Sequence, residues 1–173
     1  MVNKFPDEYL DLIYIDADHR FKYIHNDLLK SISMCSSNGI VGIIGAGNFT
    51  SAMILPCLKK TPANLKFISS SSGLSGTTLA KKYKISNSTT DNSIILEDKD
   101  VDLVMITTRH NSHANLVIDS LKSGKNVFVE KPLALNNDEL DKVLSAYSIS
   151  GKTLTVGFNR RFAPLAIQMK KVL

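Results

Sequence analysis

Short apolar runs alternate with longer amphipathic stretches along most of the chain. The runs have the length of strands and lack a regular polar position, as expected of strands buried on both faces of a parallel sheet. The predicted strands are Ile40–Ile44, Leu65–Ser69, Leu103–Thr107, Asn126–Val129 and Thr153–Gly157. The predicted helices are about Phe49–Lys60, Ser75–Tyr83, Ser112–Ser123, Asn137–Ile149 and Pro164–Val172. This alternation predicts a doubly wound α/β domain with a mostly parallel sheet.

The N-terminal part of the chain does not continue this alternation. The stretch "YLDLIYIDADHRFKYIHNDLLKSI" predicts one strand at Leu10–Ile15, a turn and one amphipathic helix at about Phe21–Ser33. The small, polar stretch Ser33–Gly39 that follows predicts a linker. We therefore divide the chain into a strand–helix extension with its linker at 1–37 and the α/β domain at 38–173. One place for the extra strand is an edge of the sheet.

Composition and charge narrow the class of protein. The 173 residues are 43% hydrophobic and 21% charged, as in ordinary globular domains, and neither a membrane-spanning apolar run nor a signal peptide is visible. Cys35 and Cys57 form no disulfide framework or CxxC motif, so we expect reduced thiols in a cytoplasmic protein. The net charge of +5 comes from dispersed basic residues without interleaved aromatics, which argues against nucleic acid and favours an anionic cofactor.

A glycine-rich turn follows the first strand of the α/β part, in "GIVGIIGAGNFTSAMILPC". Gly45 permits the tight turn, and Gly47 has no side chain, so a pyrophosphate can approach the backbone at the helix N-terminus. The third position of this G-x-G-x-x-G fingerprint is Thr50 rather than glycine. We predict that Gly45, Gly47, Asn48 and Phe49 contact a dinucleotide. The alternative is a turn that needs its glycines only for packing.

The second strand of this part ends in a run of serines, Ser69–Ser72. An acidic residue that holds the adenosine ribose is usual at this place, and no carboxylate is present here. Ser70 and Ser71 are therefore the candidate contacts. A hydroxyl-rich loop tolerates the additional 2′-phosphate of NADP, so we expect NAD or NADP as the cofactor, with NADP at least accepted. The alternative is a flexible serine loop without this role.

Two later loops carry polar residues at the carboxyl ends of predicted strands. Open α/β sheets bind their ligands at this edge. Both loops lie in "DLVMITTRHNSHANLVIDSLKSGKNVFVEKPLAL". The candidate binding residues are Thr107, Thr108, Asn111 and His113 in the first loop and Glu130, Lys131 and Pro132 in the second.

These motifs occur together in one family. In the order "GIIGAGN", "TTRHNSHANLVIDSLKSGKNVFVEKPLAL" and "VGFNRRFAP", they make residues 40–173 resemble the glucose–fructose oxidoreductase/inositol dehydrogenase family (Gfo/Idh/MocA). The likeness is greatest to the subgroup fused behind zinc-type alcohol dehydrogenase domains. It implies a Rossmann-fold NAD(P)-binding domain of an oxidoreductase that moves hydride to or from a sugar-like or cyclitol alcohol. It also places Lys131 beside the nicotinamide and substrate, and the loop with Asn111 and His113 on the nicotinamide side of the cofactor.

The chemistry of Lys131 agrees with a catalytic role. An ammonium group in a partly desolvated cleft can polarise a substrate oxygen or relay a proton. Glu130 could orient the ammonium, and Pro132 gives the chain a rigid exit for which a cis bond is open. The alternative is a surface ion pair at the end of a strand. Arg161, after the last predicted strand, is a further candidate for contact with the cofactor.

Two features depart from the family pattern. Members of the family are typically much longer and carry a second α/β domain with the substrate pocket, a further catalytic residue and usually the dimer contact. We therefore expect a truncated chain or fragment that is incomplete for turnover alone, or one completed by a partner chain. The front end differs as well, because residues 7–32 weakly resemble part of a class I S-adenosylmethionine-dependent methyltransferase through Asp16, Asp18 and His19.

The sequence leaves three functions open. The first is the cofactor domain of an oxidoreductase acting on a sugar or cyclitol, the second a non-catalytic nucleotide-binding module, and the third a remnant of a methyltransferase fusion. A small-molecule substrate and a homo-oligomer or partner chain are the expected partners, without nucleic acid or membrane. We expect no metal site, because His110 and His113 have no further ligand cluster beside them.

Overall fold

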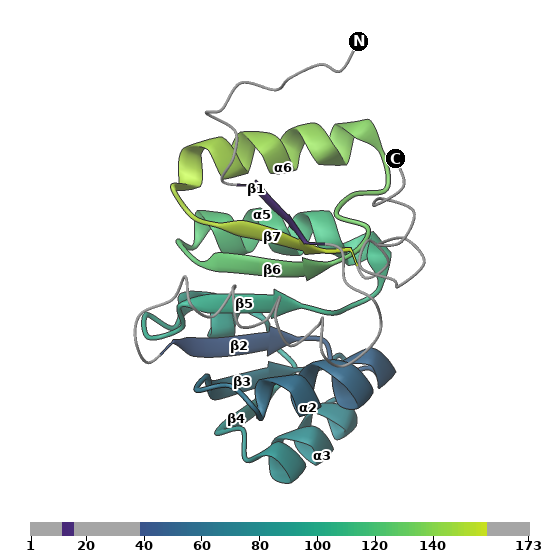
Figure 1. The fold of residues 1–173 in the computed structure, drawn as a ribbon, viewed down its shortest axis with the longest axis vertical. Coiled ribbons are helices and arrows are strands. Elements are labelled where there is room, and N and C mark those ends of the chain that lie inside the picture. Colours follow the sequence, from purple (N-terminus) through teal and green to yellow (C-terminus); the bar gives the residue numbers. More distant parts are fainter. Residues whose placement is uncertain (1–11, 16–38, 159–173) are drawn as a thin grey trace, which may run out of the picture.

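A seven-stranded parallel sheet forms the centre of the molecule. The structure, a computed structural model, describes residues 12–15 and 39–158. Figure 1 shows the strands side by side in the order β1-β7-β6-β5-β2-β3-β4, and all neighbouring strands run parallel. The strands are β1 (Leu12–Ile15), β2 (Ile40–Ile44), β3 (Asn64–Ser69), β4 (Asn87–Thr89), β5 (Leu103–Ile106), β6 (Asn126–Glu130) and β7 (Leu154–Gly157). The predicted fold class, a doubly wound α/β sheet, is confirmed.

Helical segments connect the strands from β2 onward. They are η2 (Thr50–Ile54, a π-helical segment) running into α2 (Leu55–Leu58), α3 (Leu74–Tyr83), α4 (Ser93–Glu97), η3 (His110–Ser112, a 3₁₀ turn) running into α5 (His113–Lys122), and α6 (Asn137–Ser150). The four predicted helices that fall within the described residues are confirmed, with ends shifted by one or two residues. The fifth, Pro164–Val172, lies outside the described residues.

The sheet is buried on both faces by two separate apolar clusters. Successive residues of a strand point to opposite faces, so β5 contributes Leu103 and Met105 to one cluster and Val104 and Ile106 to the other. The first cluster includes residues of η2, α2 and α3, and the second includes residues of α4, α5 and α6. All four residues of β5 are buried. This two-sided burial explains why the strands are short, unbroken apolar runs in the sequence.

One strand and one helix are not anticipated by the hydrophobic pattern. β4 is a three-residue strand at the β3 edge of the sheet with two exposed residues, and α4 is a short helix that follows it. Their sequence, Asn87–Glu97, is mostly polar and places only Ile95 fully in the core. An exposed edge strand needs little apolar surface, so the pattern gives no signal.

The start of α6 is capped by a side chain, and its end by a glycine. The Asn136 side chain accepts a hydrogen bond from the Glu139 backbone N–H at 2.9 Å, and Gly151 ends the helix in the left-handed region with φ of 61°. The Glu139 carboxylate in turn accepts from the Leu135 backbone N–H at 2.8 Å. These bonds hold the connection between β6 and α6.

The N-terminal strand joins the sheet at its β7 edge. β1 pairs in parallel with β7, with Leu12 opposite Leu154 and Ile15 opposite Gly157. A strand at Leu10–Ile15 and its docking on a sheet edge are expected from the sequence, and both are confirmed with a slightly later start. The boundary between 1–37 and 38–173 stays a prediction, because residues 16–38 lie outside the described residues.

Two lysine side chains bond to the segment that leads into β5, at the amino ends of the strands. The buried Lys125 ammonium donates to the Asp98 carbonyl at 2.6 Å and to the Val101 carbonyl at 3.0 Å. Burial lowers the pKa of Lys125, because the charged form loses water, although the carboxylates of Asp98 and Asp102 act against this shift. Nearby, Lys66 forms ion pairs with Asp98 and Asp100. This edge is thus held together by charge, away from the strand ends that carry the predicted site.

Within the described residues, no helix has both the length and the apolar composition that a membrane crossing requires.

Candidate functional site

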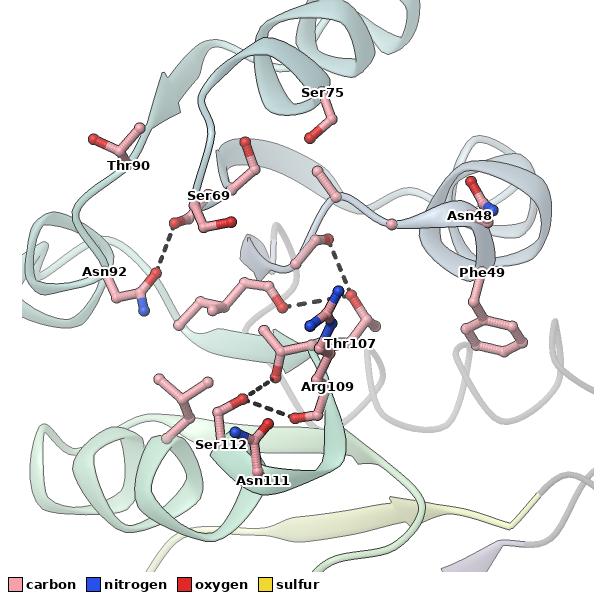
Figure 2. Close-up of a pocket in the computed structure, with 18 residues that line it drawn as sticks. Asn48, Phe49, Ser69, Ser75, Thr90, Asn92, Thr107, Arg109, Asn111 and Ser112 are labelled. Atoms are coloured by element: carbon pink, nitrogen blue, oxygen red, sulfur yellow. Dashed lines mark hydrogen bonds between the residues drawn. The ribbon is translucent and has the colours of Figure 1, made fainter.

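A pocket of about 780 Å³ opens at the carboxyl ends of β2, β3, β4 and β5. The chain moves outward from β2 to β3 and β4, then returns to pair β5 on the other side of β2, so the pocket lies at the point where the strand order reverses. Ligands of open α/β sheets bind at such a point. Figure 2 shows its lining, which consists of Ile44, Gly45, Ala46, Gly47, Asn48, Phe49, Ser69, Ser70, Ser71, Ser75, Thr90, Asn92, Thr107, Thr108, Arg109, Asn111, Ser112 and Leu116.

The two glycines of the turn after β2 have different surroundings. Gly45 has φ of 116°, and a Cβ there would lie 2.7 Å from the Thr107 carbonyl carbon. Glycine is therefore required by both the backbone angle and the close approach of β5. A Cβ on Gly47 would meet nothing within 4 Å, so the space above this residue is open to the pocket. An open backbone at the start of a helix fits the pyrophosphate of a dinucleotide.

Thr50, at the third fingerprint position, bonds the turn to the neighbouring strand. It is fully buried, and its hydroxyl donates to the Gly45 carbonyl at 3.0 Å and lies 2.8 Å from the Thr107 hydroxyl. The Thr107 hydroxyl lies 3.0 Å from the same carbonyl oxygen. Two hydroxyls thus fix the conformation of the glycine turn relative to the end of β5. Thr107 contributes to the pocket wall by holding this turn in place.

The far wall of the pocket is rich in hydroxyl groups. The Ser69 hydroxyl donates to the Asn92 side-chain oxygen at 2.6 Å, and the Ser70 hydroxyl accepts from the Gly76 backbone N–H at 3.1 Å. Ser71 is exposed at the pocket margin. Among the eighteen lining residues there is no carboxylate. This wall offers neutral hydrogen-bonding groups to a ribose and no negative charge against an additional phosphate.

The loop after β5 is held by its own side chains. The Ser112 hydroxyl lies 2.7 Å from the Thr108 hydroxyl and donates to the Arg109 carbonyl at 2.8 Å, as the dashed lines of Figure 2 show. The Ser112 backbone N–H donates to the same carbonyl at 3.1 Å. Asn111 is exposed and lines the pocket. The loop therefore presents its side chains from a fixed backbone.

His113 is fully buried and is not part of the pocket lining. Its ring lies between two backbone carbonyls of different loops, with Nδ1 at 2.7 Å from the Pro132 oxygen and Nε2 at 3.1 Å from the Thr108 oxygen. A neutral imidazole has a hydrogen on only one nitrogen and donates to one of these oxygens at a time. His113 thus joins the loop after β5 to the loop after β6, and in this structure it supports both loops from behind.

The remaining predicted residues lie at the end of β6, on the loop that follows it, or beyond. Glu130 is buried at the end of β6, and the Lys131 side chain is exposed. The Lys131–Pro132 peptide bond is cis, and the Pro132 carbonyl is the one that His113 contacts. None of these three residues belongs to the pocket lining. Arg161 lies outside the described residues.

The pocket therefore gathers nine of the predicted residues and adds others that sequence reasoning missed. The nine are Gly45, Gly47, Asn48, Phe49, Ser70, Ser71, Thr107, Thr108 and Asn111, and the additions with polar side chains are Ser69, Ser75, Thr90, Asn92, Arg109 and Ser112. Thr90 and Asn92 follow β4, which had no sequence signal. Arg109 stands in the same loop as Thr108, and its place directly after a strand end was a signal that could have found it.

No group of three or more histidine, cysteine or acidic side chains within residues 39–158 is arranged to hold a metal ion. His110 and His113 face each other edge to face, with ring centroids 5.7 Å apart.

A sequence model described as "Oxidoreductase family, NAD-binding Rossmann fold" (Gfo/Idh/MocA) matches residues 40–158. The chain belongs to this family. The matched range contains every residue of the pocket, so the pocket lies in the NAD(P)-binding domain of the family. The match does not extend to Asp16, Asp18 and His19, which lie outside the described residues, and nothing supports the methyltransferase likeness or the zinc-type fusion subgroup.

Relatives in sequence and structure agree with the family. An inositol 2-dehydrogenase/D-chiro-inositol 3-dehydrogenase of Lactiplantibacillus plantarum is 33% identical over 137 residues, which cover 77% of this chain and 39% of that protein. The crystal structure of a probable dehydrogenase from Thermotoga maritima has a TM-score of 0.70 at 31% identity, covering 77% of this chain and 40% of the other. The crystal structure of GenD2 from gentamicin A biosynthesis, in complex with NAD, has a TM-score of 0.72 at 25% identity. The match covers 78% of this chain and 38% of GenD2. The chain spans about two fifths of the length of the curated relatives it matches.

Proposed function

We propose that the pocket binds NAD or NADP and that the domain, which we place at 38–173, is the cofactor domain of an oxidoreductase. The observation that carries this proposal is the open backbone at Gly47, at the point of the sheet where the strand order reverses. A dinucleotide needs a place where its pyrophosphate can approach backbone N–H groups at a helix start, and Gly47, Asn48 and Phe49 supply one. The NAD complex of the structural relative GenD2 supports the same use of this fold.

The cofactor's two ends would be held by different walls. On the β3 side, the hydroxyls of Ser70 and Ser71 face the adenosine ribose, and the absence of a carboxylate among the lining residues supports acceptance of the 2′-phosphate of NADP. On the β5 side, Thr108 and Asn111 face the nicotinamide half. A bound nicotinamide supplies the hydride acceptor or donor of the reaction.

The reaction we propose moves hydride between this cofactor and an alcohol carbon of a sugar-like or cyclitol substrate. The Lactiplantibacillus relative, an inositol 2-dehydrogenase/D-chiro-inositol 3-dehydrogenase, supports this substrate class. Lys131 is our candidate catalytic residue, because its ammonium is exposed at the carboxyl edge of β6 and can hold or donate a proton at the substrate oxygen. Pro132 follows it directly, and His113 ties the Pro132 carbonyl to the loop that lines the pocket. Arg161 remains a proposed cofactor contact.

Titration of the chain with NADH and NADPH, followed by nucleotide fluorescence, tests the binding step. We expect both to bind, with affinities of the same order. Binding of neither would overturn the proposed function, and a strong preference for NADH would overturn only the acceptance of NADP.

Turnover is tested separately with NAD or NADP and myo-inositol, comparing the chain with Lys131→Ala. The substitution should abolish whatever hydride transfer the natural chain supports and leave cofactor affinity nearly unchanged, because Lys131 lies outside the pocket lining. The second candidate is a binding-only module, because Lys131, the candidate catalytic residue, lies outside the pocket lining. Tight cofactor binding without turnover in either protein would support that candidate.

A further inference from the structure

Arg109 is a charged residue of the pocket with no role in the function proposed above. It follows β5 by three positions, and its side chain is exposed. Figure 2 shows the guanidinium extending from the loop towards Thr107, with Ser69 and Asn92 on one side of it and Asn48 and Phe49 on the other. In this view the side chain therefore lies between the serine-rich wall after β3 and the helix start after the glycine turn.

The electrostatics of the pocket are simple because Arg109 is its one charged lining residue. The other seventeen are apolar, glycine, hydroxyl or amide residues, all within the described part of the chain. The ion pairs found between described residues both belong to Lys66, so no carboxylate in that part of the chain neutralises the Arg109 guanidinium. A positive charge without an acidic neighbour, in an otherwise neutral pocket, selects an anion.

The backbone that carries Arg109 is fixed by the bonds already described. Its carbonyl accepts from both the hydroxyl and the backbone N–H of Ser112, and its φ and ψ of −74° and 149° are extended. Two residues earlier, Thr107 bonds to the Gly45 carbonyl. The base of the Arg109 side chain is thus attached to the same hydrogen-bonded unit as the glycine turn, so their relative position is set before a ligand arrives.

We infer that Arg109 binds the pyrophosphate of the dinucleotide across the pocket from Gly47. The inference rests on the proposed function and adds to it the residue that supplies positive charge to the phosphates. The glycine turn offers backbone N–H groups, which are neutral donors. Guanidinium adds charge-assisted hydrogen bonds, for which its planar fork suits phosphate oxygens.

The test uses the full chain and three probes that share parts of the cofactor: NADH, ADP-ribose and adenosine. ADP-ribose retains the pyrophosphate without nicotinamide, and adenosine has no phosphate. Calorimetric titration compares the natural chain with Arg109→Gln and with Lys122→Gln, a control that removes an exposed charge at the far end of α5. Since the Arg109 side chain is exposed, both variants should unfold at the temperature of the natural chain.

We expect Arg109→Gln to lower the affinities for NADH and ADP-ribose by about tenfold or more, as for loss of a charge-assisted hydrogen bond. The affinity for adenosine should change by less than about twofold. Raising the salt concentration should weaken ADP-ribose binding to the natural chain more than to the variant, because the lost interaction is ionic. Lys122→Gln should bind all three probes with the affinities of the natural chain.

Three results would overturn the inference while leaving the proposed function standing. Equal binding of ADP-ribose by the natural chain and Arg109→Gln would show that the guanidinium makes no contact. An equal loss for adenosine would assign Arg109 to the adenine ring, and a loss confined to NADPH, titrated alongside, would assign it to the 2′-phosphate. Failure of the natural chain to bind NADH and ADP-ribose at all would instead overturn the proposed function.

Discussion

Gly45 and Gly47 belong to one turn and are needed for different reasons. Gly45 is required by the fold, since its φ is positive and β5 lies against its α-carbon. Gly47 has no such constraint, and its missing side chain leaves room for a ligand. A glycine motif therefore combines a residue for stability and a residue for binding, and alanine substitutions can separate the two.

Gly45→Ala should destabilise the fold. We expect the free energy of unfolding to fall by at least about 2 kcal/mol, because alanine is strained at this φ and its Cβ would overlap the Thr107 backbone. Thermal unfolding followed by circular dichroism measures the effect. A variant as stable as the natural chain would contradict the geometry of the turn.

Gly47→Ala should leave the free energy of unfolding within about 0.5 kcal/mol of the natural value, since the added methyl group meets nothing in the protein. The affinity for NADH should fall by about tenfold or more, equivalent to about 1.4 kcal/mol, because the methyl group occupies the space beside the pyrophosphate. Fluorescence titration checks this. Unchanged NADH affinity in a folded variant would place the pyrophosphate elsewhere.

Pocket residues that belong to a motif at a strand end can be predicted from the sequence. Pocket residues that are brought together from separate loops are harder to predict. Gly45, Gly47 and Thr107 follow strand ends and were found on that basis. Asn92 reaches the pocket only because β4 and α4 bring it beside Ser69, a contact between residues far apart in the chain. His113 is predicted as a cofactor contact, and in the structure its ring lies between two carbonyls of different loops, an arrangement that no spacing rule conveys.

At the scale of elements, β5 and β6 are secured at both ends by groups outside the strands. At the carboxyl end His113 joins the loops that follow them. At the amino end Lys125, just before β6, bonds the carbonyls of the segment that leads into β5. The pocket wall formed by β5 is therefore supported by contacts that do not touch the ligand.

The lowered pKa of Lys125 predicts a pH dependence of stability. A folded-state pKa below the unfolded value means that the unfolded chain binds more protons in the interval between the two, so stability rises with pH there. We expect the free energy of unfolding of the natural chain, relative to Lys125→Met, to increase as the pH rises towards about 10.5, the ordinary lysine value.

Urea unfolding of both proteins at a series of pH values measures this difference. Lys142→Met, which removes an exposed charge from α6, controls for the change in net charge. A difference that is flat or falls with pH would show that the ammonium is not desolvated in the fold.

Strands are predicted correctly where they are buried on both faces, because such strands are unbroken apolar runs in the sequence. All of β2, β3, β5, β6 and β7 were predicted, since each is an apolar run between helical stretches. β4 was not, because a short, exposed edge strand with the sequence Asn87–Thr89 has no apolar face to reveal it. The predicted helix start at Asn137 is confirmed, and the Asn136 side chain that caps it bonds only to a residue three positions away.

At the scale of the whole molecule, β1 extends the sheet beyond β7. A strand at the edge bonds its neighbour through alternate backbone N–H groups, while the others face outward. The substitutions Ile13→Pro and Tyr14→Pro should therefore differ in their effect on the free energy of unfolding. We expect one of the two to lower the free energy of unfolding by about 1–2 kcal/mol through a lost ladder bond, and the other to cost less.

Thermal unfolding of the two proline variants measures this contrast. If both variants match the natural chain, β1 contributes nothing to the stability of the sheet. If both lose stability equally, the alternation expected of an edge strand is absent.

The pairing of β1 with β7 also constrains the order of events during synthesis. β2 lies beside β3, and both leave the ribosome early and close together, so they can associate while the rest of the chain is being made. Leu12 instead finds its partner in Leu154, near the end of the described residues. Such distant contacts slow folding, because a long stretch of chain must first be closed into a loop. β1, which precedes the other described strands in the chain, is therefore among the last of them to find its place.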